Sequence, residues 1–342
     1  MNDRTYDVAV VGATGLVGET LVQVLEERNF PVGELYPLAS NRSLGKSVSF
    51  RGRSLPVLEL AGFDFSQVQL GLFSAGGAIS REYVPKAVAA GCTVIDNTSE
   101  FRYQDDVPLI VPEVNLHALE NYRARGIIAN PNCSTIQLVV ALKPIYDAVG
   151  IERVSVATYQ SVSGAGREAV EELAQQSIAL MSGRAPDPAR VIPKRIAFNC
   201  VPQIDRFEDN GYTREEMKIV WETQKILEDP GIRVSATAVR VPVFYGHSEA
   251  VSIQTATKIT VGEVRELLRR APGVEVLDER RAGGYPTAAT EAANRDTVYV
   301  GRIREDLTAE RGLNLWVVAD NVRKGAATNS VQIAEALAAR PN

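Results

Sequence analysis

The sequence predicts an α/β fold of two domains, and three observations lead to this prediction. Its 342 residues are enough for about two domains of ordinary size. Up to residue 132, short apolar runs alternate with helix-like patterns, and the runs lack polar alternation, as in a parallel sheet covered on both faces. From Cys133 onward the strand candidates alternate polar and apolar residues, which predicts an α+β domain with a mixed sheet.

The predicted elements of the first domain follow the order of a βαβ arrangement. The helix after the first strand has apolar residues such as Leu21 and Leu25 on one side and acids on the other. Strands are predicted at Tyr6–Val11, Glu34–Ala39, Leu70–Phe73, Thr93–Ile95 and Ile127–Ala129, and helices at Leu16–Glu27 and near Ile79–Ala90.

The second domain contains a segment, Val251–Thr257, with the period-two alternation of a strand with unlike faces. Further strands are predicted at Val154–Tyr159, Val234–Val243, Thr297–Ile303 and Leu313–Ala319, helices at Gly166–Met181, Arg214–Leu227 and Val261–Arg270, and an extended excursion at Ser182–Pro202. By periodicity the last helix fits either domain. We expect it to return to the first, so the predicted domains are 1–132 with helix 325–342, and 133–324.

Composition narrows the class of protein. Hydrophobic residues make up 45% and charged residues 23%, the balance of a packed globular chain, and the net charge of -5 gives no footprint for nucleic acid or an anionic membrane. The start does not resemble a signal peptide, and no apolar run is long enough to cross a bilayer. The three cysteines are far apart with no CxxC pair, which predicts no metal site, no disulfide and a cytoplasmic protein.

The segment Gly12-Ala13-Thr14-Gly15-Leu16-Val17-Gly18 joins the first strand to the first helix. In this setting glycines let a pyrophosphate reach the backbone amides and the positive end of the helix. The spacing is GxxGxxG and not the usual GxGxxG, so a tight turn without a ligand is the alternative. The place after the first strand favours a Rossmann-like dinucleotide-binding domain, with phosphate contacts from Gly12, Thr14, Gly15, Leu16 and Val17.

The end of the second strand distinguishes the two nicotinamide cofactors. An acid there binds the ribose 2′-hydroxyl of NAD. Here the strand continues into Ser40-Asn41-Arg42-Ser43, which offers a guanidinium and two hydroxyls and contains no acid. Because a guanidinium matches phosphate oxygens, Ser40, Arg42 and Ser43 predict NADP. A polar turn with a solvated Arg42 is the alternative.

Cys133 lies between the strand Ile127–Ala129 and an apolar helical pattern. The thiol is therefore expected at the first turn of a helix, where the positive end of the dipole lowers a thiol's pKa. Neighbouring amides could also stabilise an oxyanion. A small residue packed at the junction is the alternative, and that interpretation fits Cys92 and Cys200.

A nucleophilic thiol needs a partner that exchanges its proton. Of the two histidines, His247 follows a predicted strand and a glycine, so we expect it on a loop that presents its side chain. A structural histidine is the alternative. Arg240 lies seven residues earlier on the same predicted strand and could bind a substrate carboxylate.

Motifs distributed over the whole chain include VGATGLVGETLVQVLEERNFP, IANPNCSTIQLVVALKPI, TYQSVSGAGREAVEEL, IAFNCVPQID, TREEMKIVWET, RVPVFYGHSEAV and NVRKGAATNSVQIAE. Their order and spacing together resemble those of the bacterial aspartate-semialdehyde dehydrogenases. The resemblance implies that Cys133 is the nucleophile and His247 the general acid/base. It also implies that Gln160 orients the thiohemiacetal and that Asn132 helps to position the reacting carbonyl.

The resemblance also implies binding residues. The substrate α-carboxylate would contact Arg240, the α-ammonium Glu215, and the phosphate Arg102 and Lys218. Further cofactor contacts would come from Ser74, Gly76, Ser163, Gly164 and Gln332. Considered alone, Glu215 and Lys218 could form an exposed helix face, and Arg102 could be a surface residue.

The implied reaction is the reversible, NADPH-dependent reductive dephosphorylation of L-aspartyl 4-phosphate to L-aspartate 4-semialdehyde through a Cys133 thioester. It would supply lysine, threonine, methionine and diaminopimelate synthesis, with a catalytic and dimerisation domain in a homodimer or tetramer. A reductase similar to N-acetyl-glutamyl-phosphate reductase is one alternative, and a free-amine substrate better explains the acid at Glu215. A non-catalytic NADP-binding paralogue is the other, and the retained Cys133 argues against it.

Overall fold

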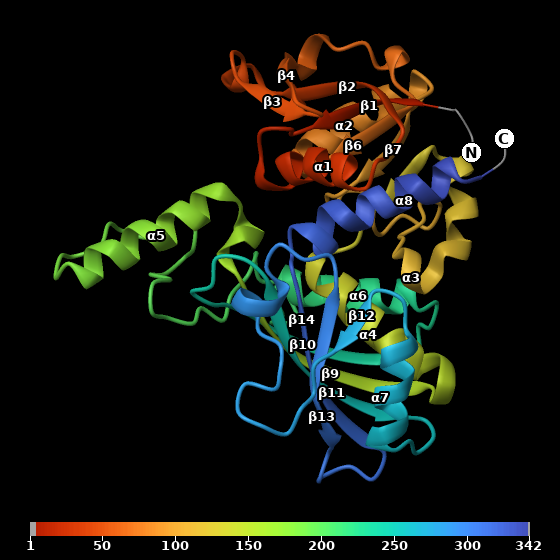
Figure 1. The fold of residues 1–342 in the computed structure, drawn as a ribbon, viewed down its shortest axis with the longest axis vertical. Coiled ribbons are helices and arrows are strands. Elements are labelled where there is room, and N and C mark those ends of the chain that lie inside the picture. Colours follow the sequence, from red (N-terminus) through yellow and green to blue (C-terminus); the bar gives the residue numbers. More distant parts are fainter. Residues whose placement is uncertain (1–4, 341–342) are drawn as a thin grey trace. The chain divides into compact units, whose positions relative to one another are not determined.

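The computed structural model describes residues 5–340 and divides into two compact units. The first comprises the chain through Asn132 together with the segment from Ala326, and the second is Cys133–Gly325. Each unit is built on its own six-stranded sheet (Figure 1). The predicted α/β class is confirmed, with a parallel sheet in the first unit and a mixed sheet in the second. The first four and last two residues of the predicted domain 1–132 and helix 325–342 lie outside the described residues.

The sheet of the first unit has the order β5-β2-β1-β6-β7-β8, and all its neighbours pair in parallel. The chain runs outward from β1 to β2 and then returns to β6 on the other side of β1. At such a switch point the carboxyl ends of the strands leave a crevice for a ligand. The strands are β1 (Tyr6–Val11), β2 (Val32–Ala39), β5 (Leu58–Glu59), β6 (Leu70–Phe73), β7 (Thr93–Asp96) and β8 (Ile127–Ala129).

Helices cover this sheet because its strands are apolar on both faces. Helix α8 contacts α1 and β7, and its Val331 and Ile333 belong to the same buried cluster as Leu21 and Leu25 of α1. A short hairpin and the first 3-10 segment follow β2. The elements are α1 (Leu16–Glu27), α2 (Gly77–Ala89), α3 (Pro112–Asn115), α8 (Thr328–Ala338), β3 (Ser47–Phe50), β4 (Arg53–Pro56), and 3-10 segments at Asn41–Ser43, Leu60–Gly62, Phe65–Gln67 and Leu116–Ala124.

The sheet of the second unit has the order β10-β9-β11-β14-β13-β12. Strand β9 pairs in parallel with β10 and antiparallel with β11, so three strands present their ends in one place. Helix α4 contacts β9, β11, β13 and β14, and the alternating burial of β11 reflects this single covered face. The elements are β9 (Ile151–Gln160), β10 (Arg233–Arg240), β11 (His247–Thr255), β12 (Val274–Val276), β13 (Val298–Glu305), β14 (Gly312–Ala319), α4 (Cys133–Val149), α6 (Arg214–Ile226) and α7 (Val261–Arg270).

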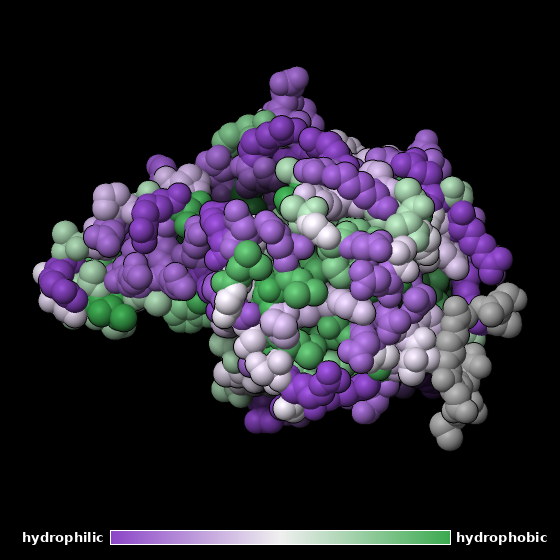
Figure 2. Space-filling view, turned by 90° about the horizontal axis from the view of Figure 1, so that it is seen from above, coloured by the Kyte–Doolittle hydropathy of each residue, from purple (hydrophilic) through white to green (hydrophobic). Residues whose placement is uncertain are grey.

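Helix α5 (Arg167–Met181) extends away from the sheet of the second unit (Figure 1). The following segment has isolated bridges but no strand or α-helix before α6, and buried polar side chains of α5 hold it. The Glu172 carboxylate accepts the backbone N–H groups of Arg190 and Val191, at 2.9 and 2.8 Å. In Figure 2 the same lobe, at the left, has apolar patches among polar side chains, and α5 exposes Ile178 and Met181.

Two expectations about the strands that flank β9 are wrong. Strand β10 ends at Arg240, not Val243, and β11 begins at His247, four residues before the predicted start. Arg240 is therefore the last residue of one strand, and His247 is the first residue of the next. The chain reverses between them because Pro242 cannot donate a ladder hydrogen bond and Gly246 takes a φ of 86°.

Candidate active site

The glycine-rich turn of the first unit allows close backbone packing between β1 and α1. Gly12 has a φ of 87°, and a Cβ there would lie 3.1 Å from backbone atoms of Ser74 and Ala75. A Cβ on Gly18 would lie 2.0 Å from the carbonyl oxygen of Gly12, so no larger residue fits. Gly15 is the N-cap of α1, whose first amides are directed toward the end of the sheet. This is a backbone cradle suited to a phosphate.

A pocket of about 470 Å³ adjoins this turn at the carboxyl ends of β1, β2 and β6. The hydroxyls of Thr14 and Ser43 are 3.1 Å apart, so the turn and the segment after β2 meet. The predicted residues that line it are Gly12, Thr14, Gly15, Ser40, Arg42, Ser43 and Ser74. The lining also includes Glu59 of β5, an acid that the sequence interpretation missed because its place beside β2 depends on strand pairing.

The remaining predicted cofactor residues do not line this pocket. Leu16 and Val17 begin α1, and Gly76 caps α2 with a φ of 95° directly after the lining residue Ala75. Gln332 is on α8, where its side-chain amide donates to the Glu113 carboxylate at 2.9 Å. Ser163 and Gly164 belong to the second unit.

Arg102 and Asn132 are buried residues of the first unit. Arg102 is 6% exposed and donates from Nη2 to the carbonyl oxygen of Asn97 at 2.7 Å. The alternative that Arg102 is an exposed surface residue is therefore wrong. Asn132 directly precedes Cys133 in the chain and is also buried.

Cys133 is the first residue of α4, as the sequence predicts, and it is half-buried. A Cβ on Gly325 would lie 2.9 Å from the Cys133 Cβ, so the glycine leaves space beside the thiol. Cys92 is packed in the first unit, and burial raises the pKa of its thiol to about 12. Cys200 is exposed outside helices and strands, so the packed-junction interpretation is wrong for this residue.

Three predicted site residues lie at the adjoining ends of β9, β10 and β11. Gln160 ends β9 opposite Arg240, which ends β10, and His247 begins β11. Arg240 donates from Nη1 to the carbonyl oxygen of Ser161 at 2.8 Å. A Cβ on Gly164 would lie 2.8 Å from that Nη1 and 3.3 Å from the Nε2 of His247. The guanidinium and the imidazole thus share one small space.

His247 is the first residue of β11 and is fully buried, which corrects the expected loop position. The backbone N–H of Ser161 donates to its Nδ1 at 3.0 Å, so Nδ1 is an acceptor and the neutral ring carries its proton on Nε2. Nε2 has no hydrogen-bond partner within residues 5–340. Burial lowers the pKa of His247 to about 3, with a further lowering from the Arg240 charge. The side chain is a neutral imidazole with a buried N–H available to a substrate.

Electrostatic interactions place Cys133, Glu215 and Arg240 in one cluster. Burial lowers the pKa of Arg240, while the charges of Glu215 and Cys133 raise it. The Glu215 charge also opposes the lowering of the His247 pKa. Cys133 and Glu215 therefore both act on Arg240, and Arg240 and Glu215 both act on His247, within the second unit.

Helix α6 fixes Glu215 by its N-terminal cap. Thr213 and Glu216 form a capping box, and Glu216 also accepts the backbone N–H of Ala238 in β10 at 2.9 Å. Glu215 accepts from the Gln160 amide at 3.1 Å and from the Lys218 ammonium at 3.1 Å. Glu215 is 5% exposed, so the alternative of an exposed acidic helix face is wrong for it.

Sequence reasoning missed Asn321, which organises the loops around His247. Its Oδ1 accepts the hydroxyls of Ser161 and Ser163, at 3.0 and 3.1 Å, and the backbone N–H of Gly246 at 2.9 Å. Asn321 begins the motif NVRKGAATNSVQIAE, which is the signal that could have drawn attention to it. Its chemistry alone does not distinguish it from a turn asparagine.

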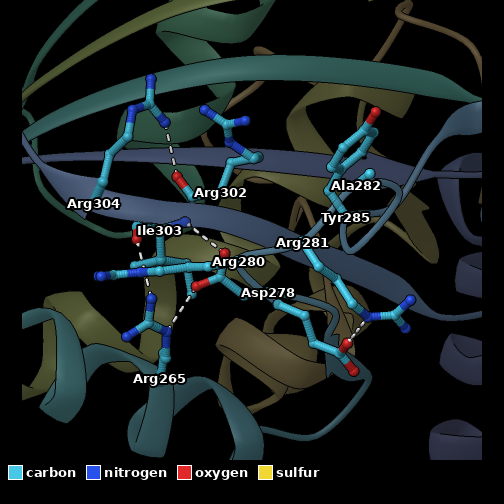
Figure 3. A pocket seen from close by; sticks show the side chains of 10 residues that line it. Arg265, Asp278, Arg280, Arg281, Ala282, Tyr285, Arg302, Ile303 and Arg304 are labelled. Carbon is cyan, nitrogen blue, oxygen red and sulfur yellow. Dashed lines mark hydrogen bonds and ion pairs between the residues drawn. The ribbon is translucent and has the colours of Figure 1, made fainter.

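A second pocket, of about 510 Å³, lies at β13 and α7 and contains none of the predicted site residues (Figure 3). Arg265 and Arg281 in its lining pair with the neighbouring acids Asp278 and Glu279. Within residues 5–340, no group of three or more histidines, cysteines and acids could hold a metal ion, and no helix is long and apolar enough to cross a membrane.

The parallel sheet with its glycine cradle, and the polar cluster around a thiol, define a two-domain nicotinamide-dependent dehydrogenase. Residues 7–122 match the semialdehyde dehydrogenase NAD binding domain, and residues 142–324 the semialdehyde dehydrogenase dimerisation domain. The chain belongs to the aspartate-semialdehyde dehydrogenase family, and it is an oxidoreductase with an NAD(P)-binding domain.

Individual relatives span nearly the whole chain. An aspartate-semialdehyde dehydrogenase of Legionella pneumophila is 64% identical over 98% of this chain and 96% of its own. A structure of aspartate semialdehyde dehydrogenase II from Vibrio cholerae, complexed with ASA, has a TM-score of 0.96 and 56% identity over 98% of both chains. An enzyme of the same name from Candida albicans with NADP has a TM-score of 0.74 and 27% identity, over 98% of this chain and 99% of its own.

Proposed function

We propose that the protein catalyses the reversible reductive dephosphorylation of L-aspartyl 4-phosphate to L-aspartate 4-semialdehyde, with NADPH as the reductant. The observation that carries this proposal is the cluster of Cys133, His247, Arg240 and Glu215. It combines a nucleophile, a proton donor, a cation and an acid around one space. These groups complement an amino acid activated at its side chain.

Cys133 begins the reaction in this proposal. Its thiolate attacks the acyl carbon, a carbon–sulfur bond forms, and phosphate leaves with the electrons of the carbon–oxygen bond. The position of Cys133 at the start of α4 favours the thiolate and places backbone amides beside the developing oxyanion. NADPH, when bound, supplies the hydride that reduces the thioester carbon.

His247 acts on the oxygen of the thiohemiacetal in this scheme. The hydride step leaves a negative charge on this oxygen, and the Nε2–H of His247 donates a hydrogen bond that stabilises it. The charged oxygen then re-forms the aldehyde carbonyl, and the carbon–sulfur electrons leave with the Cys133 thiolate. Gln160 orients the thiohemiacetal and Asn132 the reacting carbonyl in this scheme.

Substrate specificity follows from the charged residues around the thiol. Arg240 is proposed to bind the α-carboxylate and Glu215 the α-ammonium, while Lys218 and Arg102 contact phosphate. Lys218 already pairs with Glu215 and Asp205, at 3.1 and 3.0 Å, so arriving phosphate competes with two carboxylates. A free amine gives Glu215 a cationic partner, which an acetylated amine does not.

The pocket at the glycine turn is proposed to hold the adenosine side of NADP, with Arg42 on the 2′-phosphate. The predicted nicotinamide contacts are Ser74, Gly76, Ser163, Gly164 and Gln332. We also propose a homodimer or tetramer, supported by the family's dimerisation domain. The free cysteines support a reducing, cytoplasmic setting, and the family supports a role in lysine, threonine and methionine synthesis.

The reverse reaction tests the assignment. Purified protein with L-aspartate 4-semialdehyde and NADP⁺ should form more than one equivalent of NADPH per active site only when inorganic phosphate is present to release the acyl group. A higher rate with N-acetyl-glutamate semialdehyde would favour the related reductase instead. No phosphate-dependent reduction with either aldehyde would favour a non-catalytic protein. Mass spectrometry of the enzyme quenched without phosphate should find the acyl group on Cys133, with Cys92 and Cys200 unmodified.

A further inference from the structure

Two buried polar side chains follow the thiol and the imidazole on the same elements, α4 and β11. Gln137 is one helical turn after Cys133 on α4, and Glu249 is two residues after His247 on β11. These spacings put each residue on the same side of its element as the residue before it. Both side chains are fully buried, and neither has a role in the proposed chemistry.

Gln137 joins the two elements. Its Nε2 lies 3.5 Å from the carbonyl oxygen of His247, and its side chain also interacts with the Glu249 carboxyl group. Nevertheless Gln137 Oε1 and both Glu249 oxygens lack a hydrogen-bond donor among the described residues. An ionised carboxyl group would therefore be a buried charge whose oxygens accept no hydrogen bond from the described residues. A proton on the carboxyl group removes this charge and supplies a hydrogen-bond donor.

We propose that Glu249 is a positioning residue that keeps its proton at neutral pH and donates it to Gln137 Oε1. The bond fixes the helix that begins at Cys133 against the strand that begins at His247. This inference rests on the proposed function of Cys133 and His247 for its catalytic consequence, but not for the protonation state itself.

The surroundings of Glu249 favour the neutral form. Its neighbours in the sheet, Thr158 on β9 and Val317 on β14, are uncharged, and the side chain that faces it from α4 is Gln137. His247 is the titratable group before it on its own strand, and it is neutral. Burial raises the pKa of Glu249 well above its usual value, and Gln137 only partly opposes this effect. A buried carboxylate without a cation loses its hydration without compensation.

Catalysis depends on this bond because thiol and imidazole reach the substrate from different elements. A shift of about 1 Å between reacting groups can reduce a rate by two orders of magnitude. Such a shift would reduce kcat, since substrate and cofactor bind through other residues. It would also change the reactivity of the thiol in the absence of substrate.

Two substitutions of Glu249 test the positioning role. Glu249→Gln keeps the shape and an N–H donor, so kcat and its pH profile should stay within about twofold of wild type. Glu249→Leu fills similar space without a donor, and kcat should fall about tenfold or more while KM for NADPH changes little. The rate at which iodoacetamide alkylates Cys133 should differ from the wild-type rate in Glu249→Leu but not in Glu249→Gln. Wild-type kcat in Glu249→Leu, or equal loss in both variants, would overturn the proposal.

Proton linkage tests the protonation state without reference to catalysis. The folded protein keeps the proton of Glu249, whereas the unfolded chain releases it above a pH of about 4.5. The free energy of unfolding of wild type relative to that of Glu249→Gln should therefore fall as pH rises from about 5 to 7, with a tenfold change in the ratio of unfolding constants per pH unit. Glu275→Gln, at an exposed position on β12, is the matched control and should show no such trend.

If the difference in unfolding free energy between wild type and Glu249→Gln does not change over this pH range, Glu249 is ionised, and the inference is overturned. If no acyl group forms on Cys133 while the linkage is present, the proposed function fails and the protonation of Glu249 stands. If the acyl-enzyme forms and the linkage is absent, the reverse conclusion holds.

Discussion

The backbone N–H of Ser161 donates to Nδ1 of His247 across 3.0 Å, from the residue that follows β9 to the residue that begins β11. This bond assigns the tautomer of the imidazole. Since Nδ1 is an acceptor, the exchangeable proton of the neutral ring is on Nε2, which lies beside Gly164 and has no partner within the described chain. In this tautomer the imidazole can therefore donate a hydrogen bond from Nε2 to a substrate.

The first prediction concerns pH. The pKa of His247 is about 3 in the folded protein, against about 6.5 in an unfolded chain. Between these values the unfolded state binds a proton that the folded state does not, so stability is lost as pH falls from 6.5 toward 3. Denaturant titrations should show that the free energy of unfolding falls less steeply with falling pH in His247→Gln than in wild type. The two slopes should differ by about 1 kcal/mol or more per pH unit within that window. Identical pH dependence of the free energy of unfolding in the two proteins would mean that His247 titrates normally.

The same variant, His247→Gln, should also lose about 10²–10⁴ in kcat.

The second prediction concerns the nucleophile. Cys133→Ser should retain the fold and NADPH binding but reduce kcat by about 10⁴ or more, because a serine hydroxyl at this site has no strong base beside it. Steady-state kinetics and cofactor fluorescence give the two readouts. Cys200→Ser is the control, since this exposed thiol is outside the cluster and its loss should leave kcat within about twofold. A serine enzyme with near wild-type activity would refute covalent catalysis by Cys133.

The third prediction concerns the cofactor. Arg42→Glu should weaken NADPH binding about 100-fold, since it removes a charge-assisted bond and adds repulsion, and should affect NADH much less. Arg53→Glu on β4 makes the same charge change outside the lining and should leave both affinities unchanged. Glu59→Gln should favour NADPH further, because the wild-type carboxylate lines the same pocket. Equal losses for both cofactors in Arg42→Glu would remove the basis for the NADP preference.

The fourth prediction concerns the glycine turn. Gly18→Ala places a Cβ 2.0 Å from the Gly12 carbonyl oxygen, so α1 must move from β1. Overpacking of this kind costs about 1–3 kcal/mol, and NADPH affinity should fall with it. Gly62→Ala is a matched control because a Cβ there meets nothing within 4 Å. Thermal unfolding with and without NADPH separates the two effects, and an unchanged Gly18→Ala protein would contradict the close packing.

Local patterns were sufficient to predict elements whose sequence agrees with their surroundings. The ranges of β1, α1, β6, β8 and α7, and the start of α4 at Cys133, agree with the structure. The hairpin β3–β4 was missed because its strands are short and its turn is Arg51-Gly52. Both residues have positive φ, 47° and 73°, but arginine is an unusual residue there and gives no turn signal.

Features that depend on tertiary contacts could not be predicted from the sequence. His247 was expected on a loop because a glycine precedes it, yet pairing with Ala319 of β14 makes it the first strand residue. Glu59 reaches the pocket at the glycine turn through pairing of β5 with β2. The contact between Gln137 and Glu249 could not be predicted from local sequence. A glutamine in an apolar helix and a glutamate in an alternating strand come together only when the two elements pack.

Gly325 has a consequence beyond the space that it leaves at the thiol. Cys133 and Gly325 are the first and last residues of the second unit, and their backbones are in contact. The polypeptide thus enters and leaves this unit at one point, as in a domain inserted into the loop of a host. Length changes elsewhere in the inserted module need not move its two ends. Such a junction lets evolution, or a protein engineer, exchange the inserted module while the NAD-binding host keeps its connectivity.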